Sequence, residues 1–141
     1  MKLRMMMLCL CGTLIFTGGV PVLAAETSME DYGIMPAMTY IDHASADLSI
    51  SSSGKATVKS TIFGVDGATK RVTISAKLER YENGRWITIQ TFSKSSTTFY
   101  AVLTENYQVS KGYTYRVSAS VRAYTSSSSE GQTVVSSKVT Y

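Results

Sequence analysis

The stretch "VSKGYTYRVSASVRAY", residues 109–124, alternates so regularly that it constrains the fold more than any other feature. Side chains of a β-strand point to opposite faces in turn, so the pattern predicts a half-buried strand. One face carries Tyr113, Tyr115, Val117, Ala119, Val121 and Ala123. The other face carries Thr114, Arg116, Ser118, Ser120, Arg122 and Tyr124, and we expect it to meet solvent.

The same period of two recurs along the chain, and no window after Glu26 sustains a helical apolar period. Runs that read as strands are bounded by Gly, Asn and Ser, and they include "ADLSIS", "KATVKSTIFG", "KRVTISAKLERY", "RWITIQTFS", "FYAVLTENYQV" and "TVVSSKVTY". With the opening stretch they make about seven short strands, the number and spacing of an antiparallel immunoglobulin-like sandwich. The residues predicted to face its core include Ala56, Val58, Ser60, Ile62, Val72, Ile74, Ala76 and Leu78.

The N-terminus has the layout of a secretory signal peptide. Lys2 and Arg4 precede an apolar run that ends in small residues, which predicts cleavage near Ala24 or Ala25. We therefore expect a signal peptide at 1–25, a flexible leader at 26–45 and one domain at 46–141. The protein is expected to be secreted, with no stable membrane anchor.

Removal of that segment changes both the cysteine content and the charge. Cys9 and Cys11 both lie inside it, so we expect a mature chain without disulfides or thiolate metal sites. Loss of Lys2 and Arg4 leaves 12 Lys and Arg against 10 Asp and Glu, which lowers the net charge from +4 to +2. The remaining cations are scattered over several strands rather than gathered in a stripe, so nucleic acid is not an expected partner.

The residues for common catalytic chemistry are scarce. Hydrolase triads and two-histidine zinc sites need histidine, and the chain has only His43, in the predicted leader. Asp42 and Asp47 lie near it, but so few ligands in a mobile stretch do not favour a metal site. We expect no enzyme activity, no cofactor and no metal.

The beginning of the strand at 113–124 resembles a motif of fibronectin type III and immunoglobulin-like domains. Val109, Gly112 and Tyr115 occupy the places of an apolar residue, a turn glycine and a tyrosine six positions after the apolar residue. The resemblance implies that Tyr115 is a structural tyrosine corner. The wider layout, with "LERYENGRW" and "KGYTYRV", resembles a family of small secreted proteins of unknown function from Gram-positive bacteria.

The hairpin "RYENGRW" permits two registers that place Trp86, the only tryptophan, differently. A two-residue turn at Asn83 and Gly84 would pair Tyr81 with Trp86 and put Trp86, Thr88, Gln90 and Phe92 on the outer face. A three-residue loop with Gly84 as the bulge residue would turn Trp86 toward the core. We favour the three-residue loop, because such loops are common and a lone tryptophan in a sandwich is usually buried.

These patterns predict a secreted, non-enzymatic binding or interaction module. Its candidate binding surface comprises Tyr81, Trp86, Arg116, Arg122 and Tyr124, since aromatic and arginine side chains dominate interface energies. A cell-wall glycan and another extracellular protein are both open as partners. One alternative is a secreted effector, antibacterial or enzyme-inhibiting, that acts through a loop such as "TSSSSEGQ". Another is a matrix subunit that polymerises through the edge strand "TVVSSKVTY" or through the leader.

Overall fold

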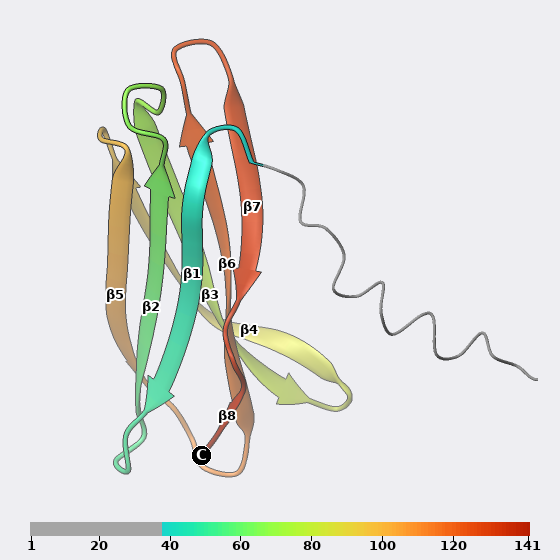
Figure 1. The fold of residues 1–141 in the computed structure, drawn as a ribbon. Helices are drawn as coiled ribbons and strands as arrows, with labels where there is room; N and C mark the ends of the chain where they lie inside the picture. The colour runs from blue at the N-terminus through green and yellow to red at the C-terminus, as the bar shows by residue number, and fades with distance from the viewer. Residues whose placement is uncertain (1–37) are drawn as a thin grey trace, which may run out of the picture. The chain divides into compact units, whose positions relative to one another are not determined.

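The computed structural model describes residues 38–141 as a sandwich of two antiparallel sheets, so the predicted all-β fold is confirmed (Figure 1). The predicted signal peptide and residues 26–37 of the predicted leader lie outside the described residues. The strands are β1 (Ile41–Ile50), β2 (Lys55–Gly64), β3 (Arg71–Glu82), β4 (Arg85–Ser96), β5 (Tyr100–Gln108), β6 (Thr114–Tyr124), β7 (Ser129–Val135) and β8 (Val139–Thr140).

One sheet has the order β1-β2-β5, and the other has the order β4-β3-β6-β7 with the short β8 also paired to β6. The fourth strand therefore lies at the edge of the sheet that contains β3, rather than beside β5. This arrangement is compatible with an immunoglobulin-like or fibronectin type III-like sandwich. Strand β7 lies at the sheet edge, but the predicted strand "TVVSSKVTY" is not continuous: β7 ends at Val135, and only Val139 and Thr140 pair again, as β8.

The core lies between the sheets and follows the predicted alternation. Every inward residue predicted for residues 55–64 and 71–78 is buried, and the core is completed by Ile41, Ala101, Leu103, Val109, Tyr115, Val117, Ala119, Val121 and Ala123. Because residues two apart on a strand share a face, the apolar halves of β2, β3, β5 and β6 meet in one layer. Burial of these side chains is the main force that holds the sheets together.

Strand β1 begins at Ile41, five residues before the predicted start at Ala46. Its register with β2 shifts between Ile41 and His43, and a bulge of this kind interrupts the alternation that marks a strand in sequence. Residues 41–45, predicted as the end of the leader, thus belong to the sheet.

The carboxylate of Glu130 on β7 holds the beginning of β1. It accepts hydrogen bonds from the backbone N–H groups of Thr39 at 2.9 Å, Tyr40 at 2.7 Å and Ile41 at 3.0 Å. These bonds, that from Thr39 foremost, lower the pKa of Glu130 because they favour the charged carboxylate. A side chain 89 residues away along the chain thus fixes where β1 starts.

The end of the β3–β4 hairpin leaves the body of the sandwich and projects to one side (Figure 1). In the body of β3, residues alternate between buried and solvent-facing positions, whereas from Glu79 to Glu82 none is fully buried. The projecting end presents side chains on both of its faces.

Candidate functional site

The turn of the β3–β4 hairpin decides the position of Trp86. Asn83 and Gly84 have φ angles of 52° and 78°, and Tyr81 pairs directly with Trp86. Two consecutive residues with positive φ form a type I′ turn, whose twist matches that of the flanking strands, and Asn-Gly is a preferred sequence for it. The prediction that Trp86 turns toward the core is therefore wrong, and its ring lies half-buried on the outer face.

A bulge at Ile89, three residues after Trp86, brings β4 into the other register. Leu78 pairs with Gln90 and Glu79 pairs with Thr88, which leaves Ile89 as the extra residue. The two-residue turn was expected to place Trp86, Thr88, Gln90 and Phe92 together on the outer face. The bulge leaves Trp86 and Thr88 there but moves Gln90 and Phe92 to the inner face. Phe92 lies opposite the buried Ala76 and packs against the core.

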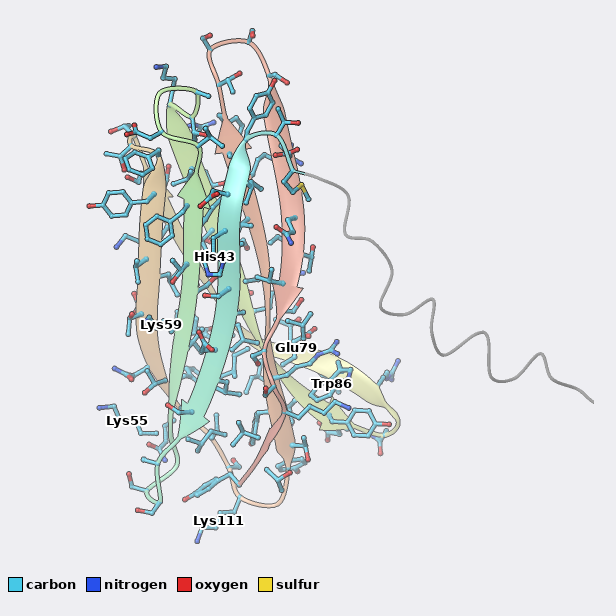
Figure 2. The ribbon with its side chains drawn as sticks, in the orientation of Figure 1. His43, Lys55, Lys59, Glu79, Trp86 and Lys111 are labelled. Carbon is cyan, nitrogen blue, oxygen red and sulfur yellow. The ribbon has the colours of Figure 1, made fainter. Side chains whose placement is uncertain are left out.

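Trp86 is the centre of a contact cluster on the outer face of β3, β4 and β6. The ring of Tyr81 lies 5.1 Å from it, centroid to centroid, and the guanidinium carbon of Arg116 lies 4.2 Å from the ring centroid. Arg116 Nε donates to Glu79 Oε1 at 2.9 Å, and Lys138 Nζ lies 5.9 Å from the ring. We call Glu79, Tyr81, Trp86, Arg116 and Lys138 the Trp86 cluster; Figure 2 labels Glu79 and Trp86.

Antiparallel pairing explains why these residues meet. Glu79 is directly opposite Arg116 on β6 and Thr88 on β4, and Tyr81 is opposite Trp86. Residues directly opposite on neighbouring strands have Cβ atoms about 5 Å apart. Three strands thus deliver an acid, a cation and two aromatic rings to one small area.

Arg122 and Tyr124 lie at the other end of β6. Six residues of strand separate Arg116 from Arg122, which corresponds to about 20 Å. Arg122 Nη1 donates to Ser129 Oγ at 2.9 Å, and the guanidinium carbon of Arg71 lies 3.9 Å from the Tyr124 ring centroid. The five residues predicted as one binding surface therefore belong to two separate groups on the same face.

Tyr115 has the geometry of a tyrosine corner. Its side chain is fully buried, and its hydroxyl donates to the carbonyl of Ser110 at 2.6 Å. Burial raises the pKa of Tyr115 because the phenolate would be poorly solvated there.

Several surface residues were missed in the sequence. Glu79 and Lys138 were not predicted to contact Trp86. The alternation of β3 places Glu79 on the outer face, but only the pairing of β3 with β6 shows that Glu79 lies beside Arg116.

On the other sheet, Phe63 and Tyr100 are 37% and 47% exposed, with ring centroids 5.7 Å apart. Neither ring was predicted to belong to a binding surface.

The loop predicted to serve an effector is shorter than "TSSSSEGQ" suggests. Strand β7 already begins at Ser129, and the turn before it is closed by Thr125 Oγ1, which accepts from the N–H of Ser128 at 2.9 Å. This loop is a tight turn with its own internal hydrogen bonds.

His43 lies on β1, opposite Phe63 on β2. Within residues 38–141, no group of three or more His, Cys, Asp or Glu side chains is placed to hold a metal ion. The same residues include no helix long and apolar enough to cross a membrane.

The sequence matches neither a protein-family model nor a curated protein.

Proposed function

We propose that this chain is an exported, non-enzymatic binding protein that recognises another extracellular protein through the Trp86 cluster. The observation that carries the proposal is the placement of Trp86 on the outer face, against Tyr81 and Arg116. Export rests on the signal-peptide pattern of the N-terminal residues.

The composition of the cluster favours a protein partner. Trp, Tyr and Arg are the residues most enriched among those that carry the energy of protein interfaces. Tyr81 is 47% exposed at the projecting hairpin, where a partner could reach it. Removing such rings from water on binding is favourable, and their stacking adds to it.

The cluster is also held in place before binding. Glu79 fixes Arg116 through the 2.9 Å ion pair, and Arg116 in turn packs over Trp86. Side chains that are already ordered lose less conformational freedom when a partner docks. The Glu79–Arg116 pair therefore acts as a support for the aromatic contact.

The same packing makes Trp86 a poor platform for a sugar. A sugar ring stacks on a bare aromatic face, whereas one face of Trp86 is covered by Arg116 at 4.2 Å and Tyr81 tilts against the ring at 57°. A protein side chain can instead pack around the edge of the cluster.

Site-specific photo-cross-linking tests the proposal. A benzoylphenylalanine placed at position 81, in the full chain produced by its native cells, is expected to trap a discrete protein species in the extracellular fraction. Trp86→Ala in the same chain should lower the yield about tenfold or more, as expected for loss of a central interface residue. Circular dichroism would verify that both variants remain folded.

A probe at Thr104 serves as the matched control, since Thr104 is exposed on the outer face of the other sheet. Equal yields at positions 81 and 104, or no cross-link at 81, would contradict the proposal. A shift of Trp86 emission on titration with neutral wall polysaccharide fragments would contradict the choice of a protein over a glycan.

A further inference from the structure

A hollow of about 440 Å³ lies on the outer face of β3, β6 and β7, away from the Trp86 cluster. Its volume is within the range of small-ligand sites. We call it the hydroxyl groove; it is lined by Thr73, Ser75, Ser120, Val121, Arg122, Gly131, Gln132 and Thr133.

The register places the hydroxyl groups of the groove in a row across three strands. Ser75 pairs with Ser120, and Ser120 pairs with Thr133, so all three side chains share the outer face. Each hydroxyl can both donate and accept a hydrogen bond. The row therefore suits a ligand that is itself rich in hydroxyl groups.

Arg122 lies beside this row because β7 has a glycine opposite it. Arg122 pairs with Gly131, and a Cβ at position 131 would come within 3.1 Å of Nη2 and 3.3 Å of Cζ of that arginine. The guanidinium thus lies across the backbone of β7, in the space that a side chain would occupy. Its Nη1 donates to Ser129 Oγ at 2.9 Å, which fixes one end of the group.

The cations at this end of the face have no acidic partners among the residues that the structure describes. The two ion pairs formed among residues 38–141 are Arg80–Glu82 and Arg116–Glu79, so neither Arg71 nor Arg122 takes part in one. Glu79 is the only acidic residue on the outer face of β3, β4, β6 and β7, and Arg116 already pairs with it. The groove therefore has a net positive charge.

We propose that the hydroxyl groove binds a sugar-acid residue of an acidic polysaccharide. The planar carboxylate would pair with the guanidinium of Arg122, whose geometry matches it, while Ser75, Ser120 and Thr133 would bond to the sugar hydroxyls. Arg71, over the Tyr124 ring, adds positive charge next to the carboxylate position. This site is independent of the protein contact proposed for Trp86, so the two proposals fail separately.

Calorimetric titration of the purified protein with alginate oligosaccharides tests the site. Alginate should bind and neutral dextran should not. Trp86 emission should stay unchanged because Trp86 packs on Arg116, which is about 20 Å along β6 from Arg122. Arg122→Gln should weaken binding about tenfold, since a charge-assisted hydrogen-bond pair is lost. Absence of alginate binding, or a change in Trp86 emission, would overturn the assignment.

Two further variants distinguish specific binding in the hydroxyl groove from nonspecific electrostatic attraction to a polyanion. Lys55→Gln removes the same charge from the outer face of the other sheet and should leave alginate affinity unchanged. Gly131→Val keeps every charge but fills the space under the guanidinium, so it should weaken binding about as much as Arg122→Gln. Equal losses in Arg122→Gln and Lys55→Gln, or equal affinities for alginate and inorganic polyphosphate, would overturn the proposal.

Discussion

The two ends of the β3–β4 hairpin obey different constraints. In the body, β3 buries Leu78 completely and β4 turns Phe92 toward the same core. Beyond the bulge, Arg80 and Ile87 continue on what was the inner face, yet neither is buried, because the hairpin has left the sandwich. The core sets the register of the body, the type I′ turn sets the register of the tip, and the bulge at Ile89 reconciles them.

The same face of β3 therefore packs in the core along the body of the hairpin and meets solvent at its tip. Arg80, which follows the core residues in register, instead pairs with Glu82 at 2.8 Å and lies over the Tyr113 ring. The hydrogen bond to Glu82 raises the pKa of Arg80 because it favours the charged guanidinium.

The largest effect is expected for truncation of the body of the hairpin. Leu78→Ala removes a fully buried side chain and should lower the free energy of unfolding by about 2–5 kcal/mol. Ile87→Ala, at the tip, should lower it by about 1 kcal/mol or less because that side chain is already partly in water. Urea unfolding measures both variants, and equal losses would show that the tip belongs to the core.

A smaller effect is expected at the tyrosine corner. Tyr115→Phe leaves the Ser110 carbonyl without its donor and should lower the free energy of unfolding by about 1–2 kcal/mol. Tyr113→Phe is the matched control, since the Tyr113 hydroxyl forms no hydrogen bond within residues 38–141. Chemical denaturation measures both variants. Equal losses of unfolding free energy would contradict a stabilising role for the Tyr115 hydroxyl.

At the tip, Gly84→Ala should lower the free energy of unfolding by about 1 kcal/mol, since φ at this position is 78° and no atom crowds the site. Gly84→Asn should cost less because asparagine tolerates positive φ better. Trp86 emission should keep its wavelength in both variants. A shift to the blue would mean that the turn had changed to a three-residue loop with Trp86 turned inward.

The smallest effect is expected from the titration of Glu130 in the body. Its pKa is lowered in the folded protein, so its stabilisation is fully present above the unfolded value of about 4.3 and is lost as the pH falls through the folded pKa. Glu130→Gln should therefore show a flatter decline in stability below that pH. Thermal unfolding between pH 7 and pH 3 measures the difference, and parallel profiles would contradict this role.

Much of the fold could be predicted because burial leaves a period of two in the sequence. Val72, Ile74 and Leu78 mark the inner face of β3 without any knowledge of their neighbours. The early start of β1 was missed because its bulge interrupts the period and because Glu130, which holds it, is distant in sequence. The predicted inward position of Trp86 was wrong because Asn-Gly favours a two-residue type I′ turn over the three-residue loop that the prediction required.

The all-β sandwich and the strand faces that meet in its core could be read from the amino-acid sequence alone. Those features follow from local alternation, which every strand carries within itself. The tertiary structure decided that Arg116 joins Glu79 and Trp86, whereas Arg122 lies over Gly131 some 20 Å away along β6. These groupings depend on pairing between strands far apart in sequence, and such pairing appears only when the sheets are assembled.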